Sequence, residues 1–248
     1  FRARHDCYSL QSIKDNISLL TEETLDKINV LIVQEGHCVL DARVTKQLNI
    51  KTDSFVVKSN IHYPTDTSLL FDAMRYLINL IAQLANKHGV SGWREYKHYI
   101  RKIRTLKRKV TSIKRSTSKA ADVVQKRDLM IEGAHKELLV LCQSMLVKLK
   151  ATFASLQKEN YINAAQVDLF KEFIGHANRQ IEQINRRIIF KQIIPHSEKV
   201  FSLFNPFTEW ISKGKAGVPV EFGLRVSISS DQHGFILTHT TNEKTSSC

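Results

Sequence analysis

The sequence predicts a mixed α+β fold in which a long helical insertion separates one strand from a β-hairpin. A segment rich in β-branched and aromatic residues occupies 48–58, and apolar residues recur every three or four positions between 67 and 192. Beyond Pro206 the composition shifts to glycine, proline and β-forming residues. The sheet must therefore be assembled from segments roughly 165 residues apart.

The helices are predicted from apolar spacing and from signals at their ends. Thr21 is a candidate N-cap for a helix over 21–34, which Gly36 is expected to end. A turn at Pro64 opens a second helix, which should stop near Gly89. Further amphipathic helices are predicted over 96–125, 132–157 and 164–192.

The strands are predicted where the helical spacing of apolar residues gives way to runs of β-branched and aromatic residues. Asp53 is expected on the strand over 48–58, and the runs 218–229 and 235–239 flank a turn around Asp231 and Gly234, which is the pattern of a hairpin. The chain then divides as follows: helical segment 1–47, strand and turn 48–66, helical insertion 67–195, hairpin 200–242 and a short, truncated tail 243–248.

The charge of the chain is local. Lys and Arg number 37 against 24 Asp and Glu, a formal net charge of +13, and residues 87–127 alone hold 14 Lys and Arg against 2 Asp and Glu. Such a segment is typical either of a solvated helical face or of contact with the phosphates of DNA. The residues expected to contact phosphate are Arg101, Lys102, Arg104, Lys107, Arg108 and Lys109.

The spacing of the cysteines and the apolar stretches indicate the cellular location of the protein. The four cysteines lie far apart, with no CxxC pair, so the sequence indicates neither a zinc finger nor a disulfide framework, and a reducing, cytoplasmic location is expected. No signal peptide and no membrane partner is predicted, because the densest apolar stretch, 77–85, is interrupted by Asn79 and Gln83.

Two blocks resemble those of one group of bacterial insertion-sequence transposases. The first is DSFVVKSNIHYPTDTSLLFDAMR at 53–75, and the second is VFSLFNPFTEWISKGKAGVPVEFGLRVSIS at 200–229. The resemblance implies a DDE transposase with an RNase H-like fold, incomplete here, that cleaves and transfers DNA strands with Mg²⁺ or Mn²⁺. It implies that Asp53 is the first catalytic, metal-binding acid and that the other acids would follow later, so the chain is expected to be an inactive fragment.

The resemblance leaves the roles of several residues undecided. Lys213 and Lys215 are expected either to contact DNA or to form a β-turn, and Trp210 is expected to be either a DNA contact or a core anchor. Glu221 either approaches Asp53, because the family's fold pairs their strands, or forms an ordinary ion pair. Additional candidate metal ligands in the first block are His62, Tyr63, Asp66 and Asp72. The alternatives are that Asp66 caps the helix that follows and that His62 is a turn residue or a hydrogen-bonding partner of a ligand.

Two functions follow from these observations. The first is a transposase that acts on the ends of its own element, with DNA as partner and with a homo-oligomer possible in the DNA complex. The alternative is a basic helical protein that binds nucleic acid, or serves as a scaffold, without catalysis. The two differ in whether a divalent metal and Asp53 are needed.

Overall fold

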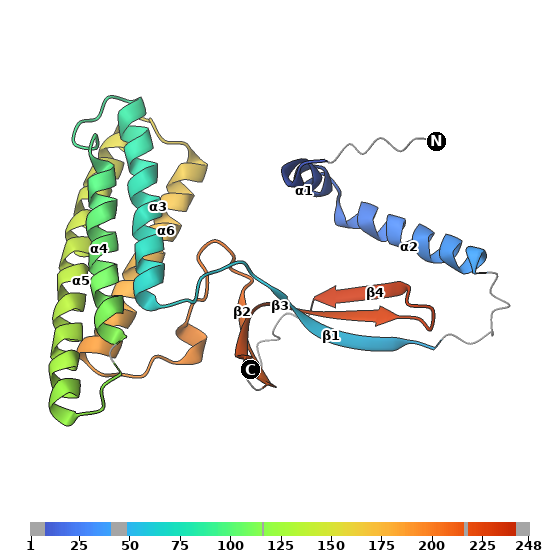
Figure 1. Ribbon diagram of the computed structural model, residues 1–248. Coiled ribbons are helices and arrows are strands. Elements are labelled where there is room, and N and C mark those ends of the chain that lie inside the picture. Colours follow the sequence, from blue (N-terminus) through green and yellow to red (C-terminus); the bar gives the residue numbers. More distant parts are fainter. Residues whose placement is uncertain (1–7, 41–48, 116, 216–217, 242–248) are drawn as a thin grey trace. The chain divides into compact units, whose positions relative to one another are not determined.

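The computed structural model describes residues 8–40, 49–115, 117–215 and 218–241, and over these ranges it has six α-helices and one antiparallel sheet of four strands (Figure 1). The predicted α+β class is confirmed. The chain forms two compact units, which we describe separately: a helical unit, 60–208, and a strand unit, formed by 1–59 and 209–248.

The helical unit is built around its first helix, α3 (Asp66–Lys87), which contacts α4 (Tyr96–Lys114), α5 (Ala121–Lys158) and α6 (Ala164–Ile184). Thr65 caps α3 by accepting a hydrogen bond from the backbone amide of Ser68. Thirteen residues of α3 are buried, among them Leu70, Met74, Leu77, Ile78 and Ile81 with no exposed surface. Burial of this apolar face is the main source of stability for the unit.

Aromatic and apolar side chains of the other helices complete this core. The rings of Phe153 on α5 and Phe170 on α6 stack with centroids 3.8 Å apart, and Tyr76 on α3 stacks on Phe173 at the same distance. One 18-residue window of α5 reaches a mean hydropathy of 1.4, so its length and composition would allow it to cross a bilayer, as is also true of many core helices in soluble proteins.

The helical insertion is divided differently from the prediction. A continuous helix over 96–125 is wrong, because α4 ends at Lys114 and α5 begins at Ala121, eleven positions before the predicted start at 132. Ala120 is extended, with φ −62° and ψ 131°. The intervening sequence is rich in serine and threonine, whose side chains compete for backbone hydrogen bonds. The last predicted helix ends early, since α6 passes into a π-helical turn at Asn185–Ile189.

The strand unit contains β1 (Lys51–Lys58), β2 (Glu209–Lys215), β3 (Val218–Ser230) and β4 (Ile236–Thr241). The long strand β3 is central: it pairs with β1 along one edge, while β2 and β4 follow each other along the opposite edge. Gly223 lies where β1 comes closest, since a Cβ atom there would be 2.1 Å from the carbonyl oxygen of Val57. The predicted pairing of the strand that carries Asp53 with the first hairpin strand is confirmed.

The turn between β3 and β4 is the one predicted around Asp231 and Gly234. The Asp231 carboxylate accepts hydrogen bonds from the backbone amides of His233 and Phe235, and Gly234 has a φ of 87°. Asp231 also binds His37 of α2 (Glu22–Val39). Gly36 does not end its helix as predicted; α2 continues to Val39, and the ring of Phe235 packs against Gly36 in the space that a side chain would need.

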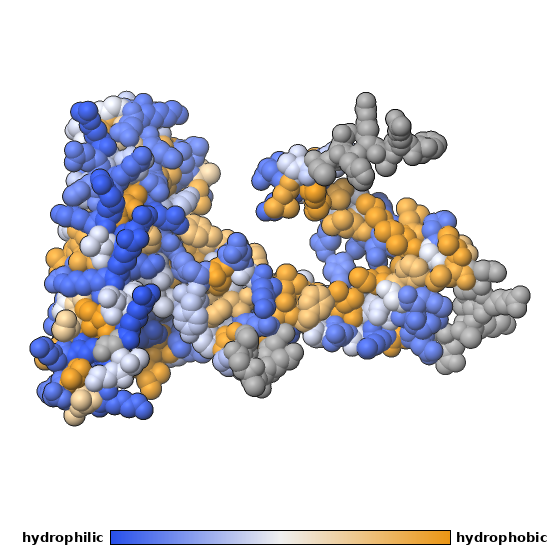
Figure 2. All heavy atoms as spheres, viewed as in Figure 1, coloured by the Kyte–Doolittle hydropathy of each residue, from blue (hydrophilic) through white to orange (hydrophobic). Residues whose placement is uncertain are grey.

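The strand unit has little apolar core. Helices α1 (Leu10–Ser18) and α2 bury none of their residues, and Ile211 is the one large apolar side chain buried among the described residues of this unit. Figure 2 shows apolar side chains open to view along α1, α2 and the strands. Phe55 is 40% and Val57 50% exposed on β1. The unit therefore gains far less from burial than the helical unit does.

We predict that the whole chain unfolds in two steps, the strand unit first. Native-state hydrogen exchange should show early exchange in α1 and α2 and the strongest protection in α3 and α5, because protection follows burial. Differential scanning calorimetry of the same sample should resolve two transitions. A single cooperative transition in which all helices exchange together would contradict this expectation.

Candidate nucleic-acid interface

A basic groove lies between α3 and α4. It has a volume of about 580 Å³. Four of its lining residues are cationic and none is acidic. The lining is Phe71, Arg104, Lys107, Arg108, Thr111, Ser112 and Arg115. The residues from α4 follow one another at helical spacing, so they share one face of that helix. We call this feature the basic groove.

Phe71 forms the floor of the basic groove. The ring is 8% exposed, and the guanidinium of Arg104 and the ammonium of Lys107 lie 5.6 Å and 5.0 Å from its centroid. Partial burial lowers the pKa of Lys107; the carboxylate of Asp72 opposes this shift, and Arg75 and Arg104 add to it. Among the described residues, no ion pair is formed by Arg104, Lys107, Arg108 or Arg115.

The six basic residues predicted to contact phosphate do not all line the basic groove. Arg101 and Lys102 line a second groove, between α4 and α5, together with Glu137. Lys109 forms an ion pair with Glu137, at 2.7 Å. The structure therefore brings together Arg104, Lys107 and Arg108 and separates them from the other three, because α4 packs between two helices that cover different sides of it.

Sequence reasoning missed some members of the groove. Arg115 lies in the basic segment but was not selected, although its spacing of seven residues from Arg108 is a usable signal. Phe71 has no signal in the sequence that sets it apart from other core residues. Lys213 and Lys215 belong to β2 rather than to a tight turn, and their side chains lie outside the described residues.

A second cluster surrounds Asp66. The residue is not a helix cap, as the sequence suggested, because Thr65 takes that role; instead Asp66 binds Arg187 at 2.8 Å. Burial raises the pKa of Asp66, while Arg187, Lys114 and Lys199 act to lower it. The carboxylate is thus held among cations.

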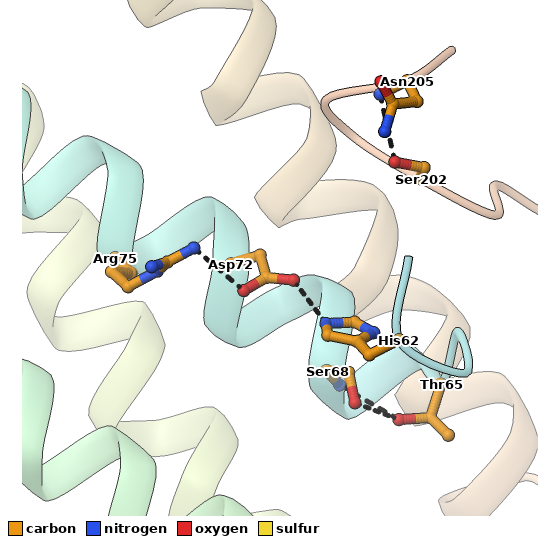
Figure 3. Close-up of polar contacts among 7 residues, drawn as sticks. All are labelled: His62, Thr65, Ser68, Asp72, Arg75, Ser202 and Asn205. Carbon is orange, nitrogen blue, oxygen red and sulfur yellow. Dashed lines mark hydrogen bonds and ion pairs between the residues drawn. The ribbon is translucent and has the colours of Figure 1, made fainter. Parts of the chain in front are cut away.

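A small cavity of about 220 Å³ is lined by the segment before α3 and by the loop that precedes β2. Its lining is Asn60, Ile61, His62, Leu69, Asp72, Arg75, Phe201, Ser202, Leu203, Phe204 and Asn205. His62 and Asp72 point toward each other, with Nε2 2.8 Å from Oδ2, and Arg75 approaches the other carboxylate oxygen (Figure 3). We call this feature the His62 cavity.

Asp53 stands apart from both features. It is exposed on β1 in the strand unit, and its carboxylate accepts a hydrogen bond from the backbone amide of Ser54. Glu221 does not approach it: Asp53 pairs with Ile228, so Glu221 is about 23 Å further along β3 and, by strand alternation, on the opposite face. Glu221 forms the ordinary ion pair, with Lys58 at 3.4 Å. Trp210 is half-buried and packs edge-on against Phe222.

The described residues do not form a site for two divalent metal ions. Mg²⁺ and Mn²⁺ require several converging oxygen ligands, and no group of three or more His, Cys, Asp or Glu side chains converges within the part of the chain that the structure describes. Asp53 is thus a single carboxylate on an exposed strand, and we derive no metal-dependent step from it.

No protein-family model matches the chain, and neither a similar curated protein nor a similar solved structure was found.

We predict that Asp53→Asn leaves the fold and the metal affinity of this chain unchanged. The carboxylate is exposed and makes one local hydrogen bond, so the free energy of unfolding should change by less than about 0.5 kcal/mol. Urea denaturation measures the stability, and isothermal titration with Mg²⁺ and with Mn²⁺ measures binding. Strong metal binding that disappears in Asp53→Asn would contradict the absence of a metal site in the described residues.

Proposed function

We propose that this chain binds DNA through the phosphates of its backbone and that the basic groove is the contact surface. The observation that carries the proposal is the convergence of Arg104, Lys107, Arg108 and Arg115 on one groove that no carboxylate lines. Phosphate neutralisation by such side chains releases condensed counterions, which favours binding. Contacts of this kind set affinity and orientation rather than the choice of sequence.

Electrostatics within α4 favours an anionic partner. Like charges three or four positions apart destabilise a helix by about 0.2–0.5 kcal/mol per pair, and Arg104 has such a neighbour in both Lys107 and Arg108. Partial burial adds to this unfavourable energy at Lys107, whose pKa is lowered. An anion in the groove would offset both effects, whereas an isolated solvated face would gain nothing from collecting these charges.

We further propose that the chain belongs to a DDE transposase of the insertion-sequence type, with an RNase H-like catalytic domain. The support is the order of the two resembling blocks, the position of Asp53 on an edge strand, and the pairing of that strand with the strand that contains PVE. In this proposal Asp53 supplies one metal-binding acid, and the described residues do not supply the others. The helical unit then holds the DNA substrate.

The second candidate is a DNA-binding protein without catalysis. It is favoured by one observation, that the described residues contain no cluster of metal-binding side chains. An assay for nicking of supercoiled DNA with Mg²⁺ or Mn²⁺ tests the first candidate, and nicking that Asp53→Asn abolishes supports the transposase. The second candidate requires DNA binding that needs no metal and survives Asp53→Asn; loss of binding in that variant would contradict it.

We predict that replacing the four cations of the basic groove by alanine weakens DNA binding and reduces its dependence on salt. Each lost phosphate contact should lower the slope of log K against log salt by about 0.9, so the loss of four contacts should lower it by about 3 to 4. Fluorescence polarisation with labelled duplex DNA at several salt concentrations measures both quantities.

The matched control replaces four exposed lysines elsewhere on the helical unit, Lys87, Lys150, Lys158 and Lys171, which changes the net charge by the same amount. This variant should retain most of the slope. Equal loss in both variants would show that net charge, and not the groove, attracts the DNA.

We predict that DNA affinity falls as the pH rises and that the fall begins at a pH below 10.5, the ordinary pKa of lysine. The pKa of Lys107 is lowered, so the protonated form that binds phosphate is lost earlier than for an exposed lysine. Lys107→Arg should remove this dependence, because arginine stays protonated. Binding curves for both proteins across the alkaline range provide the measurement, and identical pH profiles would contradict the assignment of Lys107 to the contact.

A further inference from the structure

The His62 cavity adjoins the basic groove. Phe71 and Asp72 are consecutive residues of α3, and the first lines the groove while the second lines the cavity. Asp72 and Arg75 also act on the pKa of Lys107, which places the cavity rim within electrostatic reach of the groove. A polyanionic strand bound in the basic groove would therefore pass close to the His62 cavity.

The chemistry of the cavity differs from that of the groove. Leu69 and Leu203 are 3% and 6% exposed and provide apolar surface, whereas Phe204 keeps 50% of its surface exposed. Asn60 and Asn205 add amide side chains to the lining, and His62, Asp72, Arg75 and Ser202 are polar as well. A lining that is part apolar and part polar suits a flat molecule that has hydrogen-bonding edges.

The lining also disfavours other occupants. The Asp72 carboxylate is paired with Arg75, so the two charges balance and offer a phosphate no net positive charge. A purely aliphatic group would not use the hydrogen-bonding groups of Asn60 and Asn205. A nucleobase satisfies both conditions, because it is uncharged, has an aromatic face and bears donors and acceptors on its edge.

The loop that carries Phe204 is held in place. The backbone amide of Asn205 donates a hydrogen bond to the hydroxyl of Ser202, at 3.0 Å (Figure 3). The Phe204 ring packs against Phe173 and Tyr76, with centroids 5.7 Å and 6.2 Å apart. A half-exposed ring backed by other rings is a stacking platform that requires little ordering on binding.

We propose that the His62 cavity receives one unstacked nucleobase from a single strand whose phosphates lie in the basic groove, with Phe204 stacking on the base and Asn60 and Asn205 facing its edge. The proposal rests on the proposed DNA contact of the groove and adds a preference for single-stranded or locally unpaired DNA. A paired base in a duplex cannot enter the cavity without leaving its stack.

The test compares single-stranded and duplex DNA on the whole chain. Phe204→Leu keeps an apolar side chain at this position but removes the aromatic face, and it should weaken binding of a labelled single strand about five-fold or more while duplex affinity stays unchanged. A strand with 2-aminopurine should gain fluorescence on the wild-type protein, because the base leaves its stacked neighbours, and should gain less on Phe204→Leu. The matched control is Phe207→Ala, since Phe207 is 55% exposed and does not line the cavity; its binding should match that of the wild type.

The outcomes distinguish failure of the nucleobase site in the cavity from failure of the phosphate contact in the groove. Unchanged single-strand affinity in Phe204→Leu, or an equal loss for single-stranded and duplex DNA, overturns the nucleobase site, even when the groove variant confirms phosphate contact. A groove variant that binds both DNA forms like the wild type overturns the proposed function instead. An RNA strand of the same sequence serves as a second ligand: binding that still depends on Phe204 supports the nucleobase site and shows that it accepts either sugar.

Discussion

The burial of α3 is the constraint on which the helical unit depends. This helix contacts three others and places most of its length in the core, where close packing fixes the orientation of its side chains. Residues at the border of its buried face are fixed with it. Phe71 thereby becomes the floor of the basic groove, and Asp72, one position later, becomes part of the His62 cavity. Both candidate sites are consequences of how one helix is packed.

The charge on α4 is tolerated because the opposite side of this helix is anchored. Ile100, Ile103 and Val110 are buried, so the helix stays formed although its cations repel one another. The result is a set of positive charges that start from fixed positions on one face of a formed helix. A concentration of one sign of charge of this kind favours electrostatic steering of a polyanion.

In the strand unit, the alternation of side chains decides which carboxylates can act together. The pairing of β1 with β3 has a regular register, so a residue's parity fixes its face. Asp53 and Glu221 fall on opposite faces, and Glu221 is satisfied by Lys58. The apolar surface left open on α1, α2 and β1 makes this unit the less stable of the two, which is a thermodynamic property and not evidence about its chemistry.

The sequence by itself determined the α+β class, the helix start capped by Thr21, the turn at Asp231 and the segment that carries the positive charge, because caps, period and composition are local properties. It did not determine the interruption before α5, the continuation of α2 past Gly36, or the partition of the basic residues between two grooves. Periodicity shows which residues share a face of their own helix, but not which neighbour packs against it. Only the tertiary structure joined Phe71 to Arg104 and Lys107, paired Lys109 with Glu137, and brought the 201–205 loop to His62 and Asp72, since these contacts link residues far apart in the chain and depend on how the helices pack.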